Sequence, residues 1–157
     1  MEFVIDIKQY SREFRRILGR DTADLKILRC LSKDSSIIVR VQVALNLCVS
    51  DDVIKELSND KHWKVRAAVA SNINTPKHIL DKLSKDESKD VRIAVAKNTS
   101  ALKKTLDYLA DEKSWEIKEA VILNSKTSKA TLKKLSKDED YMIKTKAEHF
   151  LKISTKN

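Results

Sequence analysis

The chain repeats itself every 26 residues, and this repeat limits its fold more than any other feature. A Leu-Ser-x-Asp segment recurs in register at residues 31–34, 57–60, 83–86 and 135–138, and residues 109–112 read Leu-Ala-Asp-Glu in the same register. The five rows contain no insertion. A period of roughly 20 to 50 residues is typical of solenoids, in which each repeat buries its apolar face against the next. We therefore expect supersecondary units that stack in sequence order.

Each row predicts a longer and a shorter helix. In the longer one, residues 65–72 (VRAAVASN) place small or apolar side chains and an asparagine on one helical face. The shorter one follows, with Thr75 predicted as its N-cap and Pro76 as its first residue. Glycine and proline occur once each, whereas a β-protein needs many turn glycines. The sequence predicts an all-α fold, an α-solenoid of about five two-helix repeats of 26 residues.

The two ends of the chain depart from the repeat, as caps do. In the first row, Ile17 aligns with Val43 of the next row, but Phe14 falls on the basic position of the repeat. In the last row, Phe150 replaces the asparagine. We expect a single domain over residues 1–157, divided into an N-terminal cap, a repeat region and a frayed tail, at residues 1–27, 28–152 and 153–157.

Two sets of polar residues recur from row to row. An acidic residue is followed six positions later by a basic one, as in Asp34 and Arg40, Asp60 and Arg66, and Asp86 and Arg92. An active site needs one such constellation and not five, so we interpret these pairs as a structural ladder. Each carboxylate is expected to cap the second helix and to meet a basic group in its own or the next row.

Asparagines end the apolar stripe of the longer helix. A buried asparagine needs hydrogen-bond partners, and the backbone of the turn that follows it is the nearest source. The residues with this structural role are Asn46, Asn72, Asn98 and Asn124.

The acidic residue followed after a fixed step by Val-Arg or Val-Lys resembles the HEAT repeat. The longer string VRAAVASNINTPKHILDKLSKD at residues 65–86 is similar to the leucine-rich repeat variant family. The resemblance implies a helical solenoid that acts as a binding or scaffold module. Members of that family can carry a cysteine-ligated iron–sulfur cluster near the N-terminus. This chain has only Cys30 and Cys48, so we expect neither a cofactor nor a metal, and we expect idle or buried free thiols.

One repeat position carries aromatic residues in three rows. Trp63 and Trp115 occupy it two rows apart, and Tyr141 takes it in the last row, with Lys64 and Lys118 close in sequence. One interpretation is that the rings pack against the turn between repeats. The other is a set of exposed anchors for a partner, because aromatic side chains beside basic ones suit both protein interfaces and stacking on bases.

The net charge of +9 has two interpretations. Lysine supplies most of the basic residues, and lysine is the default solvated charge of a protein surface, whereas arginine is the better fork for phosphate. Lysines nevertheless accumulate on the shorter helices toward the C-terminus, where they form a candidate phosphate stripe. Its members are Lys103, Lys104, Lys129, Lys133, Lys134 and Lys137.

We interpret the chain as a non-catalytic scaffold that binds a protein partner, which the sequence does not name. Nucleic-acid binding through the lysine-rich flank is the alternative. HEAT-like solenoids also include DNA glycosylases for alkylated bases, and the neighbourhoods of Asp60 with Trp63 and of Asp111 with Trp115 are the only comparable spots here. The chain has no apolar run long enough to cross a membrane and no secretory signal, so we expect a cytoplasmic monomer.

Overall fold

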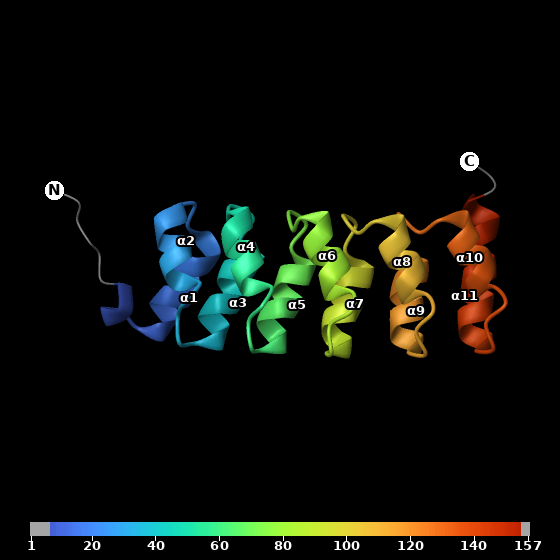
Figure 1. Ribbon diagram of the computed structural model, residues 1–157, viewed down its shortest axis with the longest axis horizontal. Helices are drawn as coiled ribbons and strands as arrows, with labels where there is room; N and C mark the ends of the chain where they lie inside the picture. Colours follow the sequence, from blue (N-terminus) through green and yellow to red (C-terminus); the bar gives the residue numbers. More distant parts are fainter. Residues whose placement is uncertain (1–6, 155–157) are drawn as a thin grey trace. The chain divides into compact units, whose positions relative to one another are not determined.

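The computed structural model describes residues 7–154, and within this range it contains eleven α-helices, one short 3-10 helix and no strand. Longer and shorter helices alternate along the chain (Figure 1). The predicted all-α fold of repeated helix pairs, an α-solenoid, is confirmed. The chain forms two compact units, residues 1–75 and residues 76–157.

The first unit contains η1 and α1 to α5. Their bounds are Ile7–Gln9 for η1, Arg12–Asp21 for α1, Leu25–Leu31 for α2, Ile37–Leu45 for α3, Asp51–Leu57 for α4 and Trp63–Ser71 for α5. The longer helices α1, α3 and α5 pack in that order. Val39 and Val43 of α3 and Val65 and Val69 of α5 have no exposed surface, because they lie on the apolar stripe that the repeat predicts.

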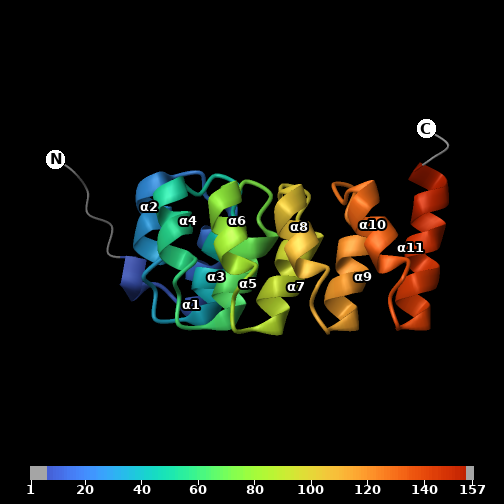
Figure 2. The same cartoon turned by 45° about the vertical axis from the view of Figure 1, so that its right-hand side comes forward.

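The second unit contains α6 to α11. Their bounds are Lys77–Leu83 for α6, Lys89–Lys97 for α7, Lys103–Leu109 for α8, Trp115–Leu123 for α9, Lys129–Leu135 for α10 and Tyr141–Ser154 for α11. The longer helices α7, α9 and α11 pack in that order (Figure 2). Leucines of the shorter helices, such as Leu106 and Leu109 of α8, close the core beside the buried Val95 and Val121.

The one glycine of the chain serves a close helix contact and not a turn. Gly19 lies within α1, and a Cβ atom added there would meet a methyl group of Val43 at 3.2 Å and the Val39 carbonyl oxygen at 3.5 Å. Glycine in a helix interior costs roughly 1 kcal/mol relative to alanine. The close contact explains why this residue is glycine. Without a side chain here, α1 approaches α3 more closely than a larger residue would allow.

One sequence prediction about a helix end is wrong by one residue. Helix α6 begins at Lys77 with Pro76 in the N-cap position, so Thr75 is not the cap. The Thr75 hydroxyl instead donates to the Val69 carbonyl oxygen at 2.6 Å, which closes the turn after α5. At the other end of the chain, α11 continues to Ser154, into the segment predicted to be frayed, and residues 155–157 lie outside the described range.

Candidate functional site

The acidic and basic residues of the repeat join consecutive rows. In the first unit, Arg40 donates from Nε and Nη2 to the two carboxylate oxygens of Asp60, at 2.6 and 3.1 Å. Its Nη1 donates to the carbonyl oxygens of Asp34 and Ser35 in its own turn, at 2.7 and 3.2 Å. Asp60 also accepts the His62 N–H at 2.8 Å. One guanidinium therefore closes its own turn and holds the turn of the next row.

The same arrangement recurs in the second unit. Arg92 donates to both carboxylate oxygens of Glu112, at 2.6 and 3.0 Å, and to the Asp86 carbonyl oxygen at 2.7 Å. Lys118 donates to Asp138 at 2.5 Å. In these pairs the basic residue comes from the row before the carboxylate, whereas the sequence interpretation expected its own row or the next. We use the name carboxylate ladder for these pairs.

Two further residues of the predicted ladder bind the backbone of their own turns. Arg66 donates from Nη1 to the Asp60 carbonyl oxygen at 2.8 Å. Asp86 accepts the Ser88 N–H at 2.8 Å, and Ser88 is the N-cap of α7. The carboxylate thus fixes the turn before the helix and does not itself occupy the N-cap position.

The ladder lowers the pKa of buried carboxyl groups. Burial raises the pKa of Asp60, but the hydrogen bond from Arg40, a backbone N–H and the Arg40 charge outweigh it, so this pKa lies below 3.8. Burial likewise raises the pKa of Asp138, and the hydrogen bond from Lys118 helps to bring it below the same value. A lowered pKa in the folded state stabilises the fold above pH 3.8, and this stabilisation is lost as the pH falls through the folded value.

An ion pair on the surface of the second unit also lowers the pKa of a carboxyl group. Lys89 donates to Glu116 at 2.6 Å, the Ser114 hydroxyl donates to its other carboxylate oxygen at 2.6 Å, and together they lower the pKa of Glu116 to about 2. We expect Lys89→Met to raise this pKa toward 4.5, because the first of the two donors is removed. A carboxyl-detected NMR titration measures it, and an unchanged pKa in this variant would show that Lys89 does not hold the carboxylate.

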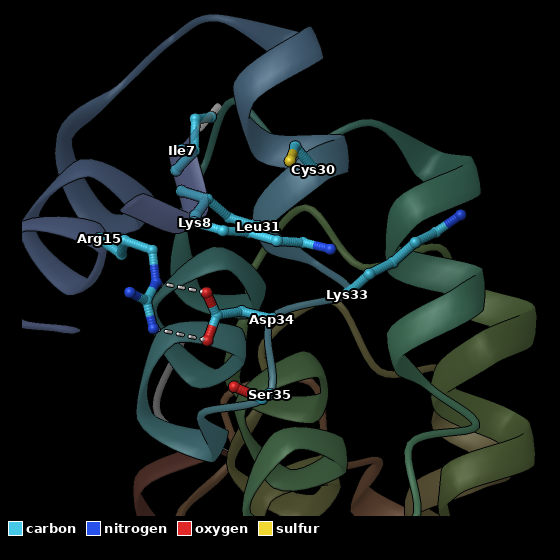
Figure 3. Close-up of a pocket in the computed structure, with 8 residues that line it drawn as sticks. All are labelled: Ile7, Lys8, Arg15, Cys30, Leu31, Lys33, Asp34 and Ser35. Carbon is cyan, nitrogen blue, oxygen red and sulfur yellow. Dashed lines mark hydrogen bonds and ion pairs between the residues drawn. The ribbon is translucent and has the colours of Figure 1, made fainter. Parts of the chain in front are cut away.

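The N-terminal row keeps the ladder at a position shifted by one residue. Arg15 donates to the carboxylate of Asp34 at 2.6 and 3.4 Å (Figure 3). It also donates to the Tyr10 carbonyl oxygen at 2.5 Å, so it bonds to a carboxylate and to a backbone carbonyl as Arg40 does one row later. The alignment that placed Phe14 on the basic position is therefore wrong by one residue. Ile17 is accordingly 39% exposed and does not occupy a core position.

A cavity of about 290 Å³ lies beside this pair in the first unit. Figure 3 shows Arg15 and Asp34 facing each other on one side of it. The residues that line it are Ile7, Lys8, Arg15, Cys30, Leu31, Lys33, Asp34 and Ser35. Its carboxylate already accepts hydrogen bonds from Arg15 and from the Ser36 N–H, so it belongs to the ladder and is not poised as a general base.

The asparagines also join consecutive rows. Asn124 donates from Nδ2 to the carbonyl oxygens of Ala96 and Asn98 in the preceding row, at 2.7 and 3.0 Å, and its Oδ1 accepts the Lys126 N–H at 2.9 Å. The bond to the following turn is the one that the sequence predicted, and the bonds to the preceding row are additional. Side-chain amides with the same i + 2 turn bond are Asn46, Asn72 and Asn98.

The aromatic repeat position lies at the first residue of a longer helix and is open to solvent. Trp63 begins α5 and is 39% exposed, with the His62 ring stacked at 6.1 Å and Lys64 Nζ at 5.7 Å from its centroid. Trp115 begins α9 and is 55% exposed, and Tyr141 begins α11 and is 76% exposed. None of the three rings is buried against a turn.

Trp115 and Tyr141 begin consecutive longer helices of the second unit that pack on each other. Met142 follows Tyr141 and is 60% exposed. We use the name aromatic edge for Trp115, Tyr141 and Met142. A groove next to these helix starts is lined by charges of both signs, namely Asp111, Lys113, Lys118, Lys134, Lys137, Asp138, Glu139 and Asp140.

The predicted phosphate stripe divides into paired and unpaired lysines. Lys134 forms ion pairs with Asp107 at 3.8 Å and Asp111 at 2.7 Å, and Lys104 lies 3.7 Å from Asp81. For the other members, the described part of the chain holds no ion-pair partner. These members are Lys103, Lys129, Lys133 and Lys137.

The first unit also has an exposed apolar pair that the sequence did not lead us to expect. Leu47 and Ile73 occupy the same repeat position, directly after the asparagine, and each is 56% exposed. Their rows are adjacent, because the Asn74 side chain donates to the Leu47 carbonyl oxygen at 2.9 Å. The signal was present in the sequence, since the later rows have Thr99 and Ser125 at this turn position.

Residues 7–154 hold no group of three histidine, cysteine or carboxylate side chains with the geometry of a metal site. Within the same range no helix is both long and apolar enough to cross a membrane. Cys30 and Cys48 are free and exposed, so of the two alternatives, buried or idle thiols, burial is wrong.

No family model matches the chain. No curated protein matches it either. Among solved structures, the chain is similar to one described as a leucine-rich repeat variant with a novel repetitive protein structural motif, with 21% identity and a TM-score of 0.73. The alignment covers 92% of this chain and 57% of that chain, so this chain spans little more than half of that protein's length. The similarity in fold to a leucine-rich repeat variant, which the repeat sequence predicted, is confirmed.

Proposed function

We propose that this chain is a non-catalytic helical-repeat scaffold that binds a protein partner at the aromatic edge. The observation that carries the proposal is the exposure of Trp115, Tyr141 and Met142 at the starts of two adjacent helices. Aromatic residues and methionine are enriched in protein interfaces, where a few such side chains supply most of the binding free energy.

The charges around the aromatic edge favour a protein over a nucleic acid at this place. The adjoining groove contains Asp111, Asp138, Glu139 and Asp140 together with lysines. Carboxylates repel a phosphate backbone, whereas a polar rim with both signs of charge is the usual surrounding of a protein–protein interface.

The repeat scaffold supports the proposal because it fixes the two anchors. The turn before α11 is tied to α9 by the ion pair of Lys118 with Asp138. The turn before α9 is tied to α7 by the ion pair of Arg92 with Glu112. Anchors held in place before binding lose less conformational entropy when a partner arrives.

We expect Trp115→Ala/Tyr141→Ala to weaken binding of a peptide selected against the chain by at least about tenfold, as truncation of hot-spot side chains does. The peptide is selected from a random display library on the immobilised protein, and its Kd is measured by fluorescence anisotropy. Because both side chains are exposed, circular dichroism should show an unchanged fold. Leu123→Ala is the matched control, since Leu123 is also exposed, at 56%, but lies at the other end of α9. Equal binding by the double variant and the wild type would overturn the proposal.

A further inference from the structure

The second unit has a second candidate surface, on which all charged lining residues are lysines. The groove beside the aromatic edge, in contrast, carries charges of both signs. The second surface lies where the longer helices end and the shorter ones begin, in the turns that follow the asparagines. Helix α9 has nine residues, so its two ends lie about 13 Å apart. Acidic residues are absent from residues 91–106 and 120–137, which contain the two turns joining α7 to α8 and α9 to α10.

An open groove occupies this end of the unit, and three separate turns supply its lysines. Lys77 begins α6, Lys103 and Lys104 begin α8, and Lys126 lies in the turn after α9. The other residues that line the groove are Thr99, Ser100, Ala101 and Leu102, and none is acidic. We use the name first lysine groove for it.

A second groove of the same character lies in the following row. It is lined by Lys129, Ala130, Lys133, Ser136, Leu151 and Lys152, again without an acidic residue. Its lysines continue the first set by the repeat, because Lys103 and Lys129 are 26 positions apart, as are Lys126 and Lys152. The fold therefore sets cations in register along consecutive rows.

Three of the four lysines of the first lysine groove have no ion-pair partner within residues 7–154, namely Lys77, Lys103 and Lys126. The fourth, Lys104, pairs with Asp81 at 3.7 Å on an exposed surface. The carboxylates of the ladder in this unit, such as Glu112 and Asp138, are already held by Arg92 and Lys118. An external anion is therefore the partner that these lysines lack.

We propose that the two lysine grooves of the second unit bind the phosphodiester backbone of a nucleic acid without reading its sequence. Lysine acts as a point charge toward phosphate, and a row of lysines without arginine forks or stacked aromatic rings contacts the backbone but not the bases. An acidic polypeptide is the less favoured ligand, because no groove residue is a large exposed apolar side chain that would anchor a peptide. No residue of the aromatic edge lines either lysine groove, so each of the two proposed surfaces can be tested without the other.

The test is fluorescence anisotropy of a labelled single-stranded 20-mer oligonucleotide of mixed sequence, titrated with the full chain across a salt series. Each lost phosphate contact removes about 0.7 from the slope of log K against log salt for a single strand. We expect Lys77→Gln/Lys103→Gln/Lys126→Gln to reduce this slope by about 2 and to weaken binding at low salt more than tenfold. All three side chains are exposed, so thermal unfolding should not change.

The matched control removes the same charge from the other end of the unit. Lys85, Lys113 and Lys137 are exposed lysines of the turns before α7, α9 and α11, and Lys85→Gln/Lys113→Gln/Lys137→Gln should keep the wild-type slope. Equal losses in both triple variants would overturn the proposal, because net charge alone would then explain the binding. It would also be overturned by absence of binding at about 50 mM salt, or by polyglutamate competing as well as an unlabelled oligonucleotide.

Discussion

Asn124→Leu is expected to lower the free energy of unfolding by about 3 kcal/mol, because the change removes three hydrogen bonds between a buried side-chain amide and the backbone, each worth about 1 kcal/mol. The carbonyl oxygens of Ala96 and Asn98 lose the Nδ2 donor, and the Lys126 N–H loses its acceptor. Asn124 is 6% exposed, so water does not readily replace the amide. Leucine has the same number of side-chain heavy atoms with the same branching, so the change leaves no cavity.

Urea denaturation followed by circular dichroism measures this loss. Ser125→Ala is the matched control, since Ser125 is exposed in the same turn and should change the midpoint little. In a repeat protein, stability is the sum of repeat and nearest-neighbour terms, so the effect should concentrate near the affected rows. Hydrogen exchange should therefore rise first for the amides of α7 and α9. A loss below about 1 kcal/mol would show that the asparagine is not the bond between these rows.

The repeat made most of this fold predictable. The apolar face predicted over residues 65–72 is confirmed, since Val65 and Val69 are fully buried, and Val39 and Val91 at the repeat position of Val65 are fully buried as well. The spacing works because each row meets the same neighbours, so one row predicts the environment of the next. The prediction failed where a row departs from the repeat. In the first row the basic residue of the ladder is Arg15, one residue later than the alignment with Phe14 predicted.

The candidate surfaces were less predictable, because exposure and pairing depend on the neighbouring row. The sequence grouped six lysines as one stripe, but the carboxylates of the preceding row reach Lys134 and not Lys103. The sequence did not group Lys77 and Lys126 with Lys103, because it does not show that their three turns line one groove. Trp115 and Tyr141 are exposed, whereas the sequence left open whether their rings pack against a turn.

The two proposed surfaces of the second unit follow from one property of the repeat. The turn before each longer helix carries the ladder carboxylates, so acidic residues are fixed at that end by stability. The turn after each longer helix is held by a neutral asparagine, so its charge is not constrained by the fold. Lysines can accumulate at the second end without disturbing the ladder, whereas a mixed-charge surface is unavoidable at the first.

Arg40→Ala is expected to lower the free energy of unfolding at pH 7 by about 3 kcal/mol, as removal of one partner of a buried ion pair does. The side chains of Arg40 and Asp60 are only 8% and 10% exposed, so the variant leaves a desolvated carboxylate without its cation. Arg20→Ala is the matched control. It removes an arginine from a pair with Asp21 in which both side chains are more than half exposed, and a small change is expected.

The effect of Arg40→Ala on stability should depend on pH, because Arg40 lowers the pKa of Asp60. The Arg40 hydrogen bond and charge help to lower the pKa of Asp60 in the wild type, despite burial, so the pair stabilises the fold above pH 3.8 and less as the pH falls below it. The difference between wild type and variant should therefore shrink between pH 5 and the lowest pH at which both fold. Arg40→Lys should retain part of the stability, because the rows with Lys118 use one ammonium for the same contact. A difference that stays constant across this pH range would assign the loss to the bonds from Arg40 to the Asp34 and Ser35 carbonyl oxygens, and not to the ion pair with Asp60.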